Sequence, residues 1–303
     1  GWNTRRPPLF VSGLFMGLGV ASKVTVAYGA VGLAVLFFGK LVVTYRALHL
    51  SSLSAGKRDE AQAAFWQKAL RTCLWCCLFF ILIPFCIYFA AFLPLTLLKH
   101  NRYDVLGRFF AYQVHMYNYH STLQATHTFE SPWYQWPFDV RNVWYYGNYN
   151  ADGSGGLRTI SVLGSPLFWW AGVPSTVYAF VCAVKKRTQP AIIASVGFLA
   201  VYLPWVLVPR CTFVYHYFTA VPFLLIALLA AWSRLAEAPR LRKPLFTRTV
   251  RGHAVALTGG QAAMLGFLAV HLTLFAVLYP VPTRARTPQH YAKPLSLHSP
   301  RLF

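Results

Sequence analysis

Long apolar segments are the feature that most constrains the fold of this chain. A helix needs about 20 apolar residues to cross a bilayer, and in hydrocarbon the backbone polar groups must be satisfied within a helix or a closed barrel. The 303 residues are 56% hydrophobic and only 12% charged, roughly half the charged fraction of soluble domains. We therefore predict an all-α polytopic membrane protein. About seven transmembrane segments can be drawn, at residues 8–22, 24–45, 70–98, 160–184, 191–208, 214–232 and 254–279.

The basic residues indicate how these segments are oriented. The net charge is +21, but no soluble basic domain is present to hold a nucleic acid, so we expect no nucleic-acid partner. Most lysines and arginines lie in alternate loops, which the positive-inside rule assigns to the cytoplasm. The loop at 99–159 then lies outside, together with Lys23, Arg210 and the C-terminal tail. Basic loops attract anionic headgroups, so membrane lipids are the first expected partners.

The same pattern divides the chain into regions. Gly13 and Gly17 lie one helical turn apart in the first apolar segment, a spacing that favours close contact with another helix. We predict three membrane helices at 1–98, a large external loop at 99–159, a four-helix membrane region at 160–280 and an external tail at 281–303.

The external loop contains a segment with helical spacing of its apolar residues. Residues 103–123 predict an amphipathic helix lying on the outer membrane surface, and the glycine-rich stretch at 146–156 predicts a turn-rich tip. The apolar side of that helix is formed by Leu106, Phe109, Phe110, Val114 and Tyr117.

Cysteine and histidine spacing does not predict a metal site. Cys73, Cys76 and Cys77 lie inside an apolar run, where cysteine behaves as a small hydrophobe, and structural zinc needs four ligands. His120 and His127 would lie two turns apart on a helix, too far to share a metal without further ligands. We expect no metal and no other cofactor.

Polar and aromatic side chains gather in the segments predicted to lie outside. Cations at a membrane face suit a lipid phosphate, because phosphate accepts charge-assisted hydrogen bonds, and aromatic faces suit sugar rings and lipid tails. Simpler explanations compete, since interfacial tryptophans form belts and Arg210 could snorkel to the headgroups. The candidates for substrate or lipid-phosphate binding are Lys23, His120, His127, Trp133, Trp136, Arg141, Arg210, Tyr215 and His216.

Three segments carry a resemblance to a known family. They are "YHSTLQATHTFESPWYQWPFDVRNVWYY" (119–146), "ISVLGSPLFWW" (160–170) and "PRCTFVYHYFTAVPF" (209–223). Together they resemble the protein O-mannosyltransferases, enzymes of the GT-C fold, and most of all the bacterial branch. "GLFMGLGVASKVTVAYG" is similar to the family's glycine-rich stretch ending in Ser-x-Lys, which puts Lys23 at the matching lysine. The resemblance covers about residues 8–280.

The resemblance implies a reaction. The family transfers mannose from dolichyl or polyprenyl phosphate to Ser/Thr hydroxyls of exported proteins, with inversion and without a metal. A carboxylate takes the hydroxyl proton, and basic groups stabilise the departing lipid phosphate. The expected partners are the lipid-phosphate-mannose donor and an exported acceptor protein, and an oligomer is compatible with the sequence. The implied location is the cytoplasmic membrane of a bacterium with an external active site, or the ER membrane in a eukaryote.

The general base is expected outside this chain. In the family it belongs to an Asp-Glu pair in the first external loop, and this chain begins at Gly1 without an initiator Met or a signal peptide, like the middle of a longer protein. No catalytic residue is therefore assigned. Asn142 and Thr219 stand where the family commonly has Pro, and Ser165 where it has Asn.

Other functions remain open. One is a GT-C transferase that adds a sugar to an envelope glycan or lipid, and another is a non-catalytic fragment or accessory subunit lacking the Asp-Glu loop. A transporter or flippase would place polar residues at mid-membrane. The apolar runs contain few of these, with His271 as the main exception.

Overall fold

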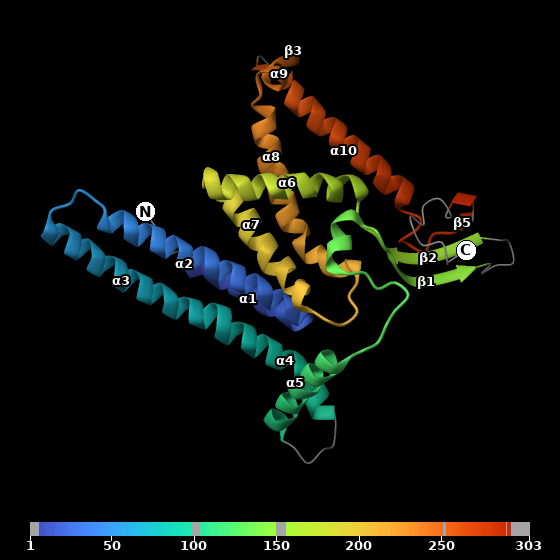
Figure 1. The fold of residues 1–303 in the computed structure, drawn as a ribbon, viewed down its shortest axis with the longest axis horizontal. Coiled ribbons are helices and arrows are strands. Elements are labelled where there is room, and N and C mark those ends of the chain that lie inside the picture. Colours follow the sequence, from blue (N-terminus) through green and yellow to red (C-terminus); the bar gives the residue numbers. More distant parts are fainter. Residues whose placement is uncertain (1–5, 99–103, 150–155, 251–252, 289, 292–303) are drawn as a thin grey trace. The chain divides into compact units, whose positions relative to one another are not determined.

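Helices dominate the structure (Figure 1). Six of the described helical segments are long and apolar enough to cross a membrane, which confirms the predicted helical membrane protein. The first predicted segment forms a helix of 17 residues that is not among these six. The computed structural model describes residues 6–98, 104–149, 156–250, 253–288 and 290–291, and it forms two compact units, Gly1–Leu123 with Leu199–Pro204 and Gln124–Phe198 with Trp205–Phe303.

The first unit begins with a helical hairpin. Helix α1 (Arg6–Ser22) and helix α2 (Ala27–His49) are joined by a 3-10 turn at Val24–Val26. Lys23 is the residue between them, and its backbone N–H donates to the carbonyl of Gly19 at 2.8 Å.

A long interrupted helix follows the hairpin. Helix α3 (Ala55–Cys77) continues through a π-helical turn (Leu78–Leu82) into helix α4 (Ile83–Leu98). Proline at position 84 has no N–H, and its ring clashes with the carbonyl four residues earlier, so a wider turn just before it accommodates the ring. The helix begins at Ala55, before the apolar segment predicted from about residue 70, because alanine, glutamate and glutamine are good helix formers.

The two glycines of α1 make the close contact predicted for them. A Cβ at Gly13 would overlap the backbone carbonyl of Phe79, and one at Gly17 would lie 2.6 Å from Cδ1 of Ile87. Both glycines are buried, so α1 packs directly on the backbone of the long helix.

The predicted helix in the large loop is confirmed as α5 (Val105–Thr122). The Asp104 carboxylate caps its start by accepting from Gly107 N at 2.6 Å, while residue 103 lies outside the described residues. Phe109 is 2% exposed and contacts the rings of Tyr88 and Phe92 on α4. One face of α5 is therefore held by α4, while its position on a membrane surface stays a prediction.

The second unit contains strands that the sequence did not predict. Strand β1 (Val143–Tyr149) pairs antiparallel with β2 (Gly156–Val162), which also pairs with β5 (Thr287–Pro288). β-Branched and aromatic residues favour such strands. Residues 146–149 and 156 of the predicted tip therefore belong to paired strands, while residues 150–155 lie outside the described part, as do residues 292–303 of the predicted tail.

Two membrane helices begin several residues later than the predicted segments. Residues 160–162 belong to β2, and the helix begins at Pro166, because proline suits the first helical turn. Residues 254–258 belong to a hairpin, and the last helix begins at Gly259 after a capping box formed by Thr258 and Gln261. The remaining elements are α6 (Pro166–Lys185), α7 (Gln189–Tyr202), 3-10 turns at Leu203–Leu207 and Val214–Ala220, α8 (Val221–Ala236), α9 (Pro239–Arg242), β3 (Pro244–Val250), β4 (His253–Thr258) and α10 (Gly259–Leu278).

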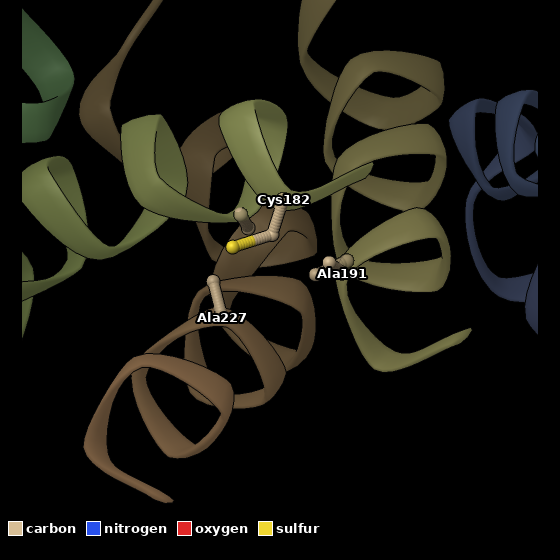
Figure 2. Packing of buried hydrophobic residues seen from close by; sticks show 5 residues of the cluster. Cys182, Ala191 and Ala227 are labelled. Atoms are coloured by element: carbon tan, nitrogen blue, oxygen red, sulfur yellow. The ribbon is translucent and has the colours of Figure 1, made fainter. Parts of the chain in front are cut away.

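Small side chains let α6, α7 and α8 pack closely. Cys182 of α6, Ala191 and Ala194 of α7 and Ala227 of α8 are all buried in one cluster with Ala179 (Figure 2). Packing through alanine and cysteine is typical of membrane helices, whose association depends on van der Waals contact. This bundle supports the loops that carry the candidate site.

Candidate functional site

The centre of the candidate site is Trp136, in the 3-10 helix Trp133–Phe138. Its side chain is 1% exposed, and the indole N–H donates to the carbonyl of Ser131 at 3.0 Å. Thr212 ties a second segment to the same residue, because its hydroxyl donates to the Ser131 carbonyl at 2.9 Å and its carbonyl accepts from Ser131 N at 2.8 Å. The Trp-rich loop and the 209–213 segment are thus one hydrogen-bonded layer.

His216 packs against this layer from the buried side of Trp136. It is 4% exposed and stacks on Trp136 with a ring separation of 5.7 Å, while the ring of Trp205 lies 4.0 Å away. Its Nδ1 is 2.9 Å from the carbonyl oxygen of Phe213. This burial favours a supporting role for His216 and Trp136 over direct contact with a ligand.

His127 differs from the buried His216 in its exposure to solvent. Its side chain is exposed, and Nδ1 accepts a hydrogen bond from Phe129 N at 3.1 Å. Because Nδ1 is the acceptor, the proton of the neutral ring is on Nε2, which can donate outward. The ring also contacts Phe213 at 5.3 Å. His127 therefore offers a positioned N–H donor to a phosphate or a sugar hydroxyl.

Arg141 and His127 are linked by hydrogen bonds to the same residue, Glu130. The guanidinium donates to the backbone carbonyl of Glu130 at 3.1 Å, and the Glu130 carboxylate accepts from His127 N at 3.2 Å. A fixed guanidinium has further donors available for bidentate contact with an anion.

The aromatic edge of the site contains one residue that the sequence analysis missed. Tyr145 of β1 stacks on Tyr215 with a ring separation of 6.4 Å, and Tyr215 stacks on Phe213 at 5.4 Å. The positive charge of Arg210 lies near the Tyr215 hydroxyl and interacts with it electrostatically. The aromatic run at residues 144–146 was the available signal for Tyr145, while Trp133 is half-buried next to Tyr134.

Asp139 is a second residue whose setting only the structure shows. It has a left-handed backbone with φ of 51° and is 8% exposed. Oδ2 accepts from Gly164 N at 2.9 Å, while Oδ1 is buried and accepts no hydrogen bond from the described residues. Burial raises the pKa of the Asp139 carboxyl to about 7, against the opposing effect of the Gly164 N–H.

The loop at Gly164 connects Asp139 to helix α10. Next to Gly164, the Ser165 hydroxyl lies 2.8 Å from Nδ1 of His271. The polar group that stood out in the last apolar run is therefore paired with Ser165, as expected for a polar side chain inside a membrane bundle.

Two of the predicted site residues belong to the first unit. Lys23 and His120 are both exposed, at the turn between α1 and α2 and in the last turn of α5. The other seven, from His127 to His216, lie in the second unit, where the contacts above bring most of them together. Among the described residues no group of three or more His, Cys, Asp or Glu side chains could hold a metal.

The fold and the site define a class of protein: a polytopic helical membrane protein with a loop layer of aromatic, histidine and arginine side chains. Residues 105–291 match the family described as "C-terminal four TMM region of protein-O-mannosyltransferase". Since this match covers more than half of the chain, the chain belongs to the protein O-mannosyltransferase family.

Similar proteins agree with this assignment. A polyprenol-phosphate-mannose–protein mannosyltransferase of Mycolicibacterium smegmatis is 26% identical over 93% of this chain and 56% of its own length. The protein of the same name from Mycobacterium tuberculosis is 24% identical over 90% of this chain and 53% of its own length. The chain thus spans about half the length of these relatives.

A solved structure shares the fold. The structure of the S. cerevisiae protein O-mannosyltransferase Pmt1-Pmt2 complex bound to the sugar donor aligns with a TM-score of 0.50 and 22% identity. The alignment covers 67% of this chain and 27% of that chain.

Proposed function

We propose that the protein transfers mannose from a polyprenyl or dolichyl phosphate carrier to Ser/Thr hydroxyls of exported proteins, with inversion at the anomeric carbon. The observation that carries this proposal is the exposed His127 ring, whose Nδ1 accepts a hydrogen bond from Phe129 N at 3.1 Å, so that Nε2 holds the N–H donor. Family membership supports the donor, because the similar mycobacterial proteins are named for polyprenol-phosphate-mannose.

The described residues are assigned to the donor and not to proton abstraction. His127 Nε2–H and the guanidinium groups of Arg141 and Arg210 bind the carrier phosphate, and this binding stabilises the negative charge that develops as the glycosidic bond breaks. Tyr145 and Tyr215 form an aromatic wall that suits the sugar or the first isoprene units. Lys23 and His120, which belong to the first unit, stay predictions from the sequence as donor-binding residues.

The proposed location is a bacterial cytoplasmic membrane with this layer on the external face, or the ER membrane in a eukaryote. The distribution of lysine and arginine supports this orientation, and six candidate membrane spans support integral membrane insertion.

The test separates the two nitrogens of His127. In His127→Asn, the amide oxygen can replace Nδ1 as acceptor for Phe129 N, but the outward donor is lost. In His127→Gln, the longer side chain returns an N–H near the position of Nε2. We expect His127→Asn to lower kcat/KM for the lipid-phosphate-mannose donor about 10- to 100-fold, the value of a hydrogen bond to a charged group, and His127→Gln to retain more activity.

The assay uses the full-length protein in liposomes, a radiolabelled polyprenyl-phosphate-mannose donor and either a Ser/Thr peptide or an envelope glycan as acceptor. His115→Asn removes an exposed imidazole of α5 and serves as the matched control. Equal activity of the Asn and Gln variants would reject a donor role for Nε2. Transfer to the glycan but not to the peptide would replace the protein acceptor with an envelope acceptor.

A further inference from the structure

A groove of about 560 Å³ lies between the β3–β4 hairpin and the first turns of helix α10. Phe246 and Leu257 pair across the two strands, and both line this groove together with Leu265 of α10. Arg248 lines it as well, two residues after Phe246. Since side chains two positions apart point to the same face of a strand, one face of the hairpin brings an apolar and a basic side chain to α10.

The hairpin lies where two candidate membrane spans meet. One span ends with α8 at Ala236, and the next begins with α10 at Gly259. A Cβ at Gly260 would lie 2.8 Å from Cβ of Ala236, so the end of α8 and the start of α10 are at the same level. Gly259 N donates to the carbonyl of Lys243 at 3.1 Å, which holds the base of the hairpin there. Because the chain crosses the bilayer before and after it, the hairpin is at a membrane face.

The groove opens onto the part of α10 that crosses the membrane. Leu265 lies about 9 Å beyond Gly259 along the helix axis. It shares one side of the helix with Leu268 and Leu272, and these three side chains are 57%, 46% and 63% exposed. The buried residues of α10 lie only at its two ends. In water this stripe would be an exposed apolar patch, whereas in a membrane span it contacts acyl chains, and Phe246 of the hairpin lies beside its first turn.

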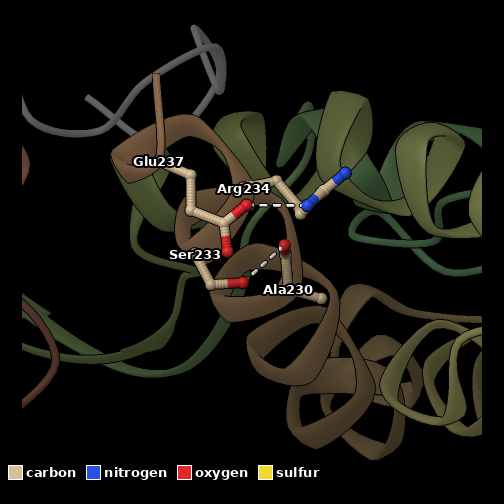
Figure 3. A network of polar contacts seen from close by, with 4 residues as sticks. All are labelled: Ala230, Ser233, Arg234 and Glu237. Carbon is tan, nitrogen blue, oxygen red and sulfur yellow. Dashed lines mark hydrogen bonds and ion pairs between the residues drawn. The ribbon is translucent and has the colours of Figure 1, made fainter. Parts of the chain in front are cut away.

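The segment between the two spans has an excess of positive charge. Its sequence at 237–258 contains one acidic residue and the basic residues Arg240, Arg242, Lys243, Arg248 and Arg251. The acidic residue, Glu237, pairs with Arg234 at 2.7 Å at the end of α8 (Figure 3). In the same turn the Ser233 hydroxyl donates to the carbonyl of Ala230 at 3.0 Å. Anionic lipid headgroups are complementary to this excess, and the positive-inside rule assigns the segment to the cytoplasmic face.

We propose that the β3–β4 hairpin anchors this end of α10 in an anionic lipid leaflet. Phe246 and Leu257 insert among the acyl chains beside Leu265, and an acyl chain of an anionic phospholipid occupies the groove. Arg248 binds the phosphate of that lipid, because its aliphatic stem can follow the apolar groove while its guanidinium reaches the headgroup level. The anchor is independent of the mannosyl-donor site and does not depend on which sugar or acceptor the protein uses.

The test measures lipid contact in the full-length protein, placed in nanodiscs with equal parts of phosphatidylglycerol and phosphatidylcholine. A fluorescent amino acid replaces Phe246, which is 60% exposed, and the acyl chains of only one of the two lipids carry bromine, which quenches fluorescence on contact. The same probe at Thr247 is the matched control, because adjacent side chains of a strand point to opposite faces. Brominated phosphatidylglycerol should lower the fluorescence of the probe at 246 and leave that of the probe at 247 largely unchanged.

The headgroup contact is tested by Arg248→Gln in the protein that carries the probe at 246. With Arg248 present, quenching by brominated phosphatidylglycerol should exceed quenching by brominated phosphatidylcholine. Arg248→Gln should reduce this preference about fivefold, the contribution of one basic residue near an anionic surface. Lys186→Gln removes an exposed charge from the same unit and the same predicted side but outside the groove, and it should leave the preference unchanged. Both side chains are exposed, so we expect both variants to fold.

Several results would overturn the proposal. Quenching of the probe at 246 by aqueous iodide, but by neither brominated lipid, would place the hairpin in water. Protection from iodide and from both lipids would mean that another protein segment or a second copy covers the groove. Equal quenching at 246 and 247 would reject the face assigned to the membrane. Equal quenching by the two lipids, or an equal loss of preference in Arg248→Gln and Lys186→Gln, would exclude Arg248 as the phosphate ligand.

Discussion

Asp139→Asn should remove a pH dependence of stability that the buried carboxyl imposes on the second unit. Burial raises the pKa of Asp139 from 3.8 to about 7, so the folded protein holds this proton more tightly than the unfolded chain does. The stabilising contribution is then fully present below the unfolded pKa and is lost as the pH rises through the folded pKa. A difference of about three pKa values corresponds to about 4 kcal/mol, which is an upper value because loop relaxation lets water reach the charge.

The asparagine side chain is neutral at every pH and keeps an oxygen for Gly164 N. We therefore expect wild type to lose stability relative to the variant between about pH 4 and pH 7, because the variant lacks this titrating carboxyl, and we expect the variant to be the more stable protein at pH 8. The assay is thermal unfolding of the protein in detergent from pH 4 to pH 8, followed by intrinsic fluorescence. Asp59→Asn removes an exposed carboxylate of α3 and is the matched control.

Two results would refute this reasoning. Parallel pH profiles for wild type and Asp139→Asn would show that the carboxyl titrates as it does in the unfolded chain. A variant that is less stable than wild type at pH 8 would show that the ionised carboxylate has partners in solution that hold it in place.

Two further predictions concern packing and hydrogen bonds. Gly13→Ala places a methyl group against the Phe79 backbone and should destabilise the first unit by about 1–3 kcal/mol. The control is Gly29→Ala on α2, where a Cβ meets nothing within 4 Å. This variant should be neutral or slightly stabilising in the same unfolding assay. Thr212→Val should lower the free energy of unfolding by about 1 kcal/mol and increase proteolysis of the Trp-rich loop, because the hydrogen bond to the Ser131 carbonyl is lost. Thr212→Ser keeps the hydroxyl and should retain this hydrogen bond. Equal effects of the two substitutions would contradict the prediction.

The helices of the loop and membrane regions were predictable because their signals are local. The apolar spacing of residues 105–122 predicted α5 within about two residues at its start and one at its end, since helix periodicity is written in consecutive side chains. Gly13 and Gly17 predicted a close helix contact for a similar reason, although the sequence did not say which helix would be the partner.

The strands and helix starts were missed where two signals competed. Residues 160–162 and 254–258 are mostly apolar and join long apolar runs, so hydropathy alone merges them with α6 and α10. Pro166 and the Thr258–Gln261 capping box start the helices later. Pairing between β1 and β2, and between β3 and β4, then uses the backbone groups of the residues left outside the helices.

In the candidate site, the sequence identified residue types, while the structure decided which of these side chains are exposed. The sequence placed His127 and His216 in one list because both are histidines in external motifs. The structure separates them, because His216 is enclosed by Trp136, Trp205 and Tyr215, while His127 is exposed with one nitrogen already used. Asp139, to which the sequence analysis gave no role, is a buried carboxyl.

By itself the sequence determined that this is a helical membrane protein of the protein O-mannosyltransferase family, because hydropathy adds up along the chain and motifs are contiguous. The tertiary structure alone decided which polar groups are buried and which aromatic rings enclose His216. These properties depend on partners distant in sequence, such as Ser131 and Thr212, which are 81 positions apart. Burial is created only when such segments meet, and no local pattern records it.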